Sequence, residues 1–131
     1  MTGPRQLAVA PAGPKGTDAI VTASRVLIVD DSLVARSSIQ RIVEAMPGFS
    51  VAASIASAQA AMAYLADHVV DIIVLDIEMP DRSGLDALPE LLALSGDARV
   101  LVLSSHCGDG APVTIKALAL GASDTLSKPD R

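Results

Sequence analysis

Apolar and polar positions follow two alternating patterns along most of the chain. Short, mostly apolar runs of strand length occur at 25–30, 49–55, 69–76, 98–104 and 123–127. Between them, apolar residues recur every three or four positions, the spacing of an amphipathic helix, at 35–46, 58–65, 85–92 and 112–120. Pro89 lies in the third helical segment and should disturb its first turns unless it occupies the first helical position. The pattern therefore predicts five strands alternating with four helices.

Strict alternation of strands and helices with short connections is typical of a parallel sheet, because parallel strands need crossovers of about this length. Right-handed crossovers place helices on both faces of the sheet. We therefore predict an α/β domain with a doubly wound, five-stranded parallel sheet over residues 25–131. Residues 1–24 contain three Pro and three Gly and neither periodicity, which indicates a flexible N-terminal tail.

Composition narrows the class of protein. The 131 residues suffice for one domain, and the net charge of −5 without a basic stripe argues against nucleic-acid binding. The longest apolar runs are too short to span a membrane, and the N-terminus lacks the apolar segment of a secretory signal. The single Cys107 cannot form an internal disulfide, which fits a reducing compartment. These features together predict a cytoplasmic protein.

Polar side chains gather where the predicted strands end. The first strand ends in Asp30, which Asp31 follows, and the third strand ends in Asp76. The fourth strand ends in Ser104, and Lys128 follows the fifth strand. In open α/β sheets, ligands bind beyond the carboxyl ends of the strands, where the strand order reverses. We therefore expect these five side chains to form one site.

Three carboxylates at one edge need a compensating cation. Two such charges about 4 Å apart repel by roughly 4 kcal/mol at an effective dielectric constant of 20. Oxygen ligands of this kind suit Mg²⁺. With Lys128 as a fixed positive charge and Ser104 as a donor, the set suits phosphoryl transfer. Asp76 is the favoured nucleophile, to form an aspartyl phosphate, because it ends what should be a central strand.

Four motifs carry a family resemblance. They are VDDS at 29–32, LDIEMPDRSGLD at 75–86, VLSS at 102–105 and KP at 128–129. In this order they resemble the signature of the bacterial two-component response-regulator receiver domain, over residues 25–129. LDIEMP with SGLDAL, VLSSH and VTIKALALGASD is most similar to the N-terminal receiver of chemotaxis protein-glutamate methylesterases. The resemblance implies a flavodoxin-like sheet with strand order 2-1-3-4-5.

The resemblance also implies a phosphoacceptor and a metal site. Asp76 would be phosphorylated by a histidine kinase of the chemotaxis type. Asp31 and Asp76 would ligate Mg²⁺ directly, with Mn²⁺ as a substitute, and Asp30 would bind the ion through water. The backbone carbonyl of Glu78 would be the third protein ligand. Two positions stay open for the Glu78 side chain, which either reaches the waters of the ion or faces solvent.

The remaining implied roles concern the phosphoryl group and the switch. Ser104 and Lys128 would contact the phosphoryl group, and the peptide bond before Pro129 would be cis. Receivers commonly carry an aromatic residue three positions before the lysine. Thr125 stands there in this chain, so the family's usual coupling between a hydroxyl and an aromatic ring lacks its ring.

The chain ends at Arg131, before the fifth helix of the family fold, and it lacks the G-x-S-x-G nucleophile motif of an esterase. We expect a fragment of a longer methylesterase, in which phosphorylation releases an inhibited effector domain that acts on chemoreceptor glutamates. The chain itself would catalyse only its own phosphorylation and dephosphorylation.

Three alternatives stay open. The first is a stand-alone receiver in a phosphorelay, which would use the same site. The second is a Mg²⁺-dependent phosphohydrolase with an aspartyl nucleophile, suggested by the D-x-E at 76–78. It is less favoured because the chain leaves no room for a cap over a substrate, and because the acids of the first strand have no role there. The third is an α/β scaffold whose acids are ordinary surface charges.

Overall fold

The structure is a computed structural model that describes residues 23–80, 83–105 and 112–128. Its strands are β1 (Ser24–Val29), β2 (Phe49–Ile55), β3 (Ile72–Asp76), β4 (Arg99–Ser104) and β5 (Asp124–Ser127). Its helices are α1 (Leu33–Ala45), α2 (Ala58–Asp67), α3 (Gly84–Ser95) and α4 (Pro112–Ala119). The predicted alternation is therefore confirmed. Nearly all of the predicted tail, the bond before Pro129 and any fifth helix after Lys128 lie outside the described residues.

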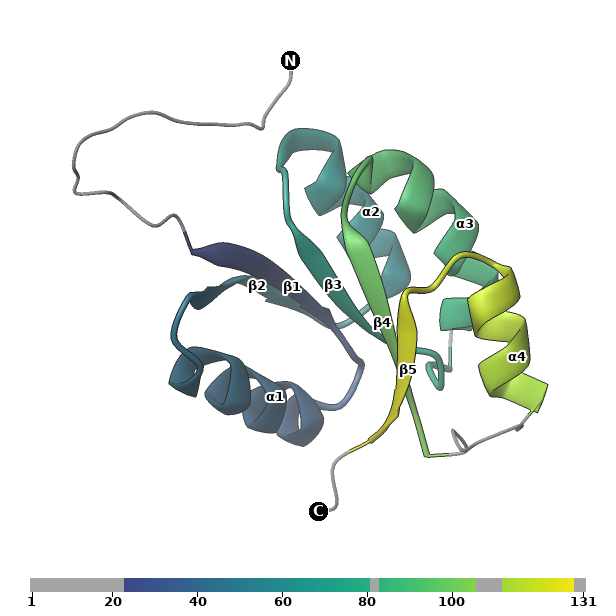
Figure 1. Cartoon of the computed structure of the whole chain (residues 1–131), viewed down its shortest axis with the longest axis horizontal. Helices are drawn as coiled ribbons and strands as arrows, with labels where there is room; N and C mark the ends of the chain where they lie inside the picture. The colour runs from purple at the N-terminus through teal and green to yellow at the C-terminus, as the bar shows by residue number, and fades with distance from the viewer. Residues whose placement is uncertain (1–22, 81–82, 106–111, 129–131) are drawn as a thin grey trace.

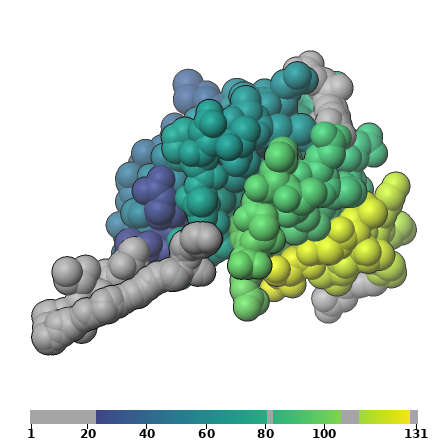
Figure 2. Space-filling view, turned by 90° about the horizontal axis from the view of Figure 1, so that it is seen from above, coloured from purple at the N-terminus to yellow at the C-terminus, as the bar shows by residue number. Residues whose placement is uncertain are grey.

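All neighbouring strands pair in parallel, in the order β2-β1-β3-β4-β5, which confirms the predicted topology. Helix α1 covers one face of the sheet, and α2, α3 and α4 cover the other (Figure 1). Figure 2 shows α4 and β5, in yellow, along one side of the molecule, with the N-terminal elements on the other. The strand order reverses between β1 and β3, so the carboxyl ends of these two strands mark the expected binding edge.

The apolar run of β1 is buried on both faces, as a central parallel strand should be. Leu27 and Val29 point into the larger core, beneath α2 and α3. Val26 and Ile28 point to the α1 face, where they pack in a smaller core with Ile39, Val43, Val74 and Leu103. The two cores clamp β1 from both sides and fix the position of the residues that follow it.

Serine caps begin three of the helices. The hydroxyls of Ser32, Ser57 and Ser83 accept hydrogen bonds from backbone N–H groups in the first turns of α1, α2 and α3. Such caps satisfy donors that a helix start leaves unpaired. Only three residues separate the end of β1 from the start of α1, so the connection at the binding edge is short.

Strand β3 is shorter than predicted. It begins at Ile72, whereas the apolar pattern placed its start at Val69, whose side chain is 73% exposed. Just ahead of the strand, the Asp71 carboxylate accepts a hydrogen bond from the backbone N–H of Arg25 at 2.8 Å, and the Asp71 N–H donates to the Arg25 carbonyl at 2.9 Å. These polar contacts hold the start of β3 against β1, and an apolar pattern does not register them.

The expected disturbance at Pro89 is not observed. Pro89 lies inside α3, beyond the first helical position, and the helix runs through it from Gly84 to Ser95. An interior proline costs a helix about 3 kcal/mol. The fully buried Leu88 and Leu91 flank it, and burial of two such side chains contributes a similar amount or more. Tertiary packing therefore maintains the helix. None of the helices in the described ranges has the length and apolar content needed to span a membrane.

Candidate functional site

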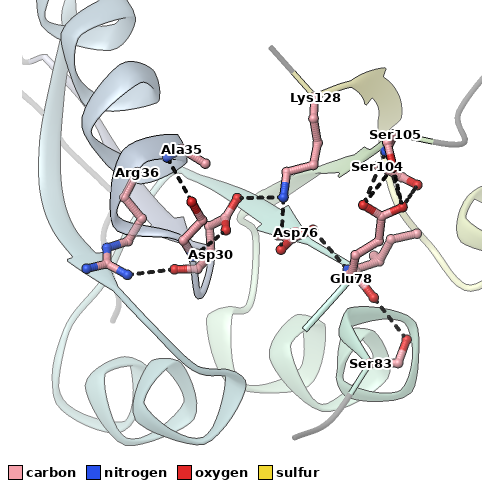
Figure 3. A network of polar contacts seen from close by, with 11 residues as sticks. Asp30, Ala35, Arg36, Asp76, Glu78, Ser83, Ser104, Ser105 and Lys128 are labelled. Atoms are coloured by element: carbon pink, nitrogen blue, oxygen red, sulfur yellow. Dashed lines mark hydrogen bonds and ion pairs between the residues drawn. The ribbon is translucent and has the colours of Figure 1, made fainter. Parts of the chain in front are cut away.

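Three of the predicted site residues meet at the carboxyl edge of the sheet. Lys128 follows β5, and its Nζ lies 3.4 Å from Oδ2 of Asp30 and 3.3 Å from Oδ2 of Asp76 (Figure 3). Both carboxylates are fully buried, whereas the lysine side chain is 20% exposed. One ammonium group thus bridges acids that come from two different strands.

Asp30 is held by the connection between β1 and α1. Its Oδ1 accepts a hydrogen bond from the backbone N–H of Ser32 at 2.8 Å. Nη1 of Arg36, in the first turn of α1, donates to the backbone carbonyl of Asp30 at 2.8 Å. Sequence reasoning missed Arg36, although a cationic residue near a helix N-terminus is unfavourable unless it has a specific partner. The guanidinium therefore fixes the loop that carries the first two acids.

Asp76 is positioned through both of its oxygens. Oδ1 accepts the backbone N–H of Glu78 at 2.9 Å, and Oδ2 faces Lys128. Burial raises the pKa of the Asp76 carboxyl from 3.8 to about 6; the nearby Asp30 adds to this rise, while the Glu78 N–H and Lys128 oppose it. Asp76 is therefore mostly ionised at pH 7, but it is poorly solvated and more basic than an ordinary carboxylate.

The Lys128 ammonium responds to the same acids. Burial alone would lower the pKa of Lys128, but the charges of Asp76 and Asp30 outweigh it and raise that pKa. The lysine is therefore charged at any physiological pH. Thr125, at the position of the missing aromatic ring, lies on β5 opposite Val102 of β4.

The acids also form a potential cation site. Asp30, Asp31 and Asp76 each offer one carboxylate oxygen, and these atoms lie within 4.8 Å of one another. Oδ2 of Asp30 and Oδ2 of Asp76 are buried and face the Lys128 ammonium at 3.4 and 3.3 Å. Carboxylate oxygens gathered in this way are suitable ligands for a hard divalent cation. The predicted ligation by the backbone carbonyl of Glu78 stays a prediction.

Neither of the two positions left open for the Glu78 side chain describes it fully. Its carboxylate accepts a hydrogen bond from the Ser104 hydroxyl at 2.8 Å (Figure 3). The backbone N–H of Ser105 lies 3.2 Å and its hydroxyl 2.9 Å from the same Oε2. Glu78 therefore joins the turn after β3 to the end of β4. Ser104, which is almost fully buried, lies at the predicted edge but donates to Glu78.

The start of α3 packs directly behind Asp76. A Cβ atom on Gly84 would lie 2.5 Å from the backbone oxygen of Asp76 and 2.8 Å from Cα of Ile77. Both atoms belong to the backbone, so a side chain fits here only if the helix moves. The Ser83 hydroxyl also donates to the Ile77 carbonyl at 3.4 Å. Gly84 therefore supports the site by allowing this close approach. It lies in the motif LDIEMPDRSGLD, but hydrophobic periodicity did not single it out.

Comparison with known proteins identifies the family. Residues 26–131 match the family model described as "Response regulator receiver domain". The chain belongs to the response-regulator receiver family. The receiver is 50% identical over 105 residues to protein-glutamate methylesterase/protein-glutamine glutaminase 2 of Caulobacter vibrioides, a match that covers 80% of this chain and 30% of that protein. The corresponding enzyme 1 of Rhodospirillum rubrum is 45% identical, with 80% and 27% covered. The receiver thus spans less than a third of these relatives.

Solved structures agree with the family assignment. The response regulator domain of Thermotoga maritima CheB superposes with a TM-score of 0.75 at 36% identity, covering 82% of this chain and 79% of that one. A structure described as the P1 domain of CheA3 in complex with CheY6 from R. sphaeroides matches with a TM-score of 0.72 at 35% identity, covering 83% and 84%. The predicted resemblance and the flavodoxin-like topology of the receiver are therefore confirmed.

Proposed function

We propose that this receiver is a phosphorylation-dependent regulatory domain whose phosphoacceptor is Asp76. The observation that carries the proposal is the environment of that carboxylate. One oxygen is held by a backbone N–H, and the other lies 3.3 Å from the Lys128 ammonium in a buried position. A carboxylate nucleophile is effective when it is oriented and desolvated and when a fixed positive charge receives the charge of the incoming group.

The transfer reaction assigns roles to these residues. An oxygen of Asp76 attacks the phosphorus of a phosphodonor in line with the leaving group, and the bond to that leaving group breaks as the aspartyl–phosphate bond forms. Lys128 then contacts a phosphoryl oxygen, and Ser104 donates to another. A hard cation, Mg²⁺ or Mn²⁺, neutralises the transferred charge when it is bound. Asp30, Asp31, Asp76 and the carbonyl of Glu78 would hold it.

The biological setting belongs to the same proposal. The curated relatives are named as protein-glutamate methylesterases/protein-glutamine glutaminases, and the receiver matches less than a third of their length. We infer that the receiver regulates such an effector domain in the cytoplasm. By analogy with the solved CheA3–CheY6 complex, a chemotaxis-type histidine kinase would be the phosphodonor. The likeness to CheY6 also supports the second candidate, a stand-alone receiver of a phosphorelay, which uses the same acceptor.

The test is direct chemical labelling. The full chain is incubated with Mg²⁺ and acetyl phosphate, and its intact mass is measured over time. We expect one added phosphoryl group, no label in Asp76→Asn, and full labelling in Asp97→Asn, an identical substitution of an exposed acid ahead of β4. An unlabelled wild type, or a label that persists in Asp76→Asn, contradicts the proposal.

A further inference from the structure

The carboxylate of Glu78 already engages the hydroxyl that phosphoryl binding requires. A serine hydroxyl has a single proton to donate. In this structure Ser104 donates it to Oε2 of Glu78 at 2.8 Å, an ordinary distance for a strong hydrogen bond to a charged acceptor. Ser104 therefore cannot donate to a phosphoryl oxygen on Asp76 while it keeps this bond.

Ser105 fixes Glu78 in this arrangement. Its backbone N–H and its hydroxyl both lie within hydrogen-bond distance of the Glu78 carboxylate, at 3.2 and 2.9 Å from Oε2. In the close-up, the side chain of Glu78 extends to the two serines, while Lys128 extends to Asp30 and Asp76 (Figure 3). Three donors from consecutive residues of the β4 end thus converge on one carboxylate.

The same residue also touches the phosphoacceptor. The backbone N–H of Glu78 donates to Oδ1 of Asp76 at 2.9 Å. The backbone of Glu78 therefore orients Asp76, and its side chain engages Ser104. A change at Asp76 and a change at Ser104 both act on Glu78, from opposite ends.

We propose that Glu78 is a positioning residue that competes with the phosphoryl group for the Ser104 hydroxyl. The inference rests on the proposed phosphorylation of Asp76 and adds the regulation of that site. When Asp76 is phosphorylated, a phosphoryl oxygen accepts the hydrogen bond of the Ser104 hydroxyl, and the hydrogen bond from Ser104 to Glu78 is lost. The Glu78 carboxylate keeps its contacts with Ser105. The competition sets how readily the end of β4 responds to phosphorylation.

Replacing Glu78 by Gln tests this competition with the least change in shape. The amide oxygen still accepts from Ser104, but the bond loses the assistance of a full charge, which roughly halves its strength. The backbone N–H on Asp76 and the backbone carbonyl are unaffected. A phosphoryl analogue should then engage Ser104 more easily, and we expect its half-saturating concentration to fall about fivefold.

The experiment titrates the full chain with beryllofluoride in the presence of Mg²⁺ and follows the backbone amide signal of Ser105 by NMR. In the wild type this signal should shift on titration, because the Glu78 carboxylate loses the Ser104 hydrogen bond and its contact with the Ser105 N–H changes. In Glu78→Gln it should be displaced already before titration. The matched control is Glu44→Gln, the same substitution near the end of α1, where the exposed side chain accepts a hydrogen bond from Gln40 at 3.3 Å. Glu44→Gln should change neither the half-saturating concentration of beryllofluoride nor the Ser105 amide signal.

A background without the hydroxyl separates competition from simple charge repulsion. In Ser104→Ala, beryllofluoride should bind more weakly, and adding Glu78→Gln should then produce no further gain. An equal gain with and without the Ser104 hydroxyl overturns the proposal, because it would mean that Glu78 only repels the anion. Ser105→Ala, which removes a donor without changing charge, should give a smaller gain of the same sign as Glu78→Gln.

The remaining outcomes distinguish a failure of this inference from a failure of the proposed function. An unchanged or higher half-saturating concentration in Glu78→Gln overturns the inference, while acetyl phosphate labelling of Asp76 in the wild type would leave the proposed function intact. If the wild type neither binds beryllofluoride nor takes a label on Asp76, both the function and the inference fail. The two failures are thus distinguishable from the same set of samples.

Discussion

Substituting Asp76 by Asn should stabilise the folded chain at pH 7. Burial raises the pKa of this carboxyl from 3.8 to about 6, so the folded state resists its ionisation. At about 1.4 kcal/mol per pKa unit, ionisation of Asp76 costs the folded state roughly 3 kcal/mol. Asn removes the charge and keeps an oxygen for the Glu78 N–H, but its amide N–H faces Lys128 less favourably. We therefore expect a gain of about 1–3 kcal/mol in the free energy of unfolding.

The sign of the pH dependence follows from linkage. Because the folded pKa lies above the unfolded value, the folded state binds more protons between about pH 4 and pH 6, and stability falls as the pH rises through this window. Well below the unfolded pKa of 3.8, Asp76 is protonated in both states and the difference between the wild type and the variant should vanish. Above about pH 6 the difference should be constant. The variant lacks this contribution at every pH.

Urea unfolding of the wild type and Asp76→Asn in EDTA, from pH 4 to pH 8, measures the difference curve. Asp31→Asn is the control, because Asp31 belongs to the same acid cluster but is exposed. Adding Mg²⁺ should reduce the gap, since a cation that binds only the folded acids stabilises the wild type by mass action. A variant that is no more stable than the wild type at pH 7, or a difference independent of pH, would refute the reasoning.

Two further perturbations test the support of the site. Lys128→Met removes the ammonium that bridges Asp30 and Asp76. Urea unfolding at pH 7 should show a loss of about 2–3 kcal/mol in the free energy of unfolding. This is less than the roughly 3–5 kcal/mol expected for a fully buried pair, because the lysine is partly exposed. The loss should shrink at pH 5, where Asp76 is protonated, and a loss independent of pH would count against the bridging role. Gly84→Ala places a Cβ atom 2.5 Å from the backbone oxygen of Asp76. It should lower the free energy of unfolding by about 1–3 kcal/mol and slow the labelling of Asp76 by acetyl phosphate. Unchanged stability and labelling would show that α3 moves freely.

The arrangement of the fold was accessible from the sequence because periodicity reports burial directly. The run at 25–30 is apolar at every core position, and the structure buries both faces of β1. The acids after β1 and at the end of β3 were predicted to meet because parallel strands end at one edge, and the ion pairs of Lys128 confirm that placement. The predicted start of β3 at Val69 was wrong: Val69 is exposed, the strand begins at Ile72, and Asp71 just ahead of it makes polar contacts with Arg25.

The detailed contacts of the site were not accessible in the same way. The Glu78 side chain reaches Ser104, 26 positions later in the chain, and no local pattern specifies that pairing. The contact of Arg36 with the Asp30 carbonyl depends on the path of a short loop. The close approach of Gly84 depends on the angle at which α3 meets β3. Sequence patterns specify which residues lie at the same edge of the sheet. These contacts depend in addition on the distances between side chains at that edge.

In this parallel sheet, the two ends of the domain lie at different distances from the buried acids. The chain enters β1 at Ser24, at the edge away from Asp76, and the six residues of this strand span about 20 Å. It leaves β5 through Lys128, the residue that touches both buried carboxylates. A fluorophore or tether attached ahead of Ser24 therefore reports on the domain from a distance. A fluorophore or tether attached after Lys128 is only a few backbone bonds from the acids, so any displacement of the lysine also displaces it.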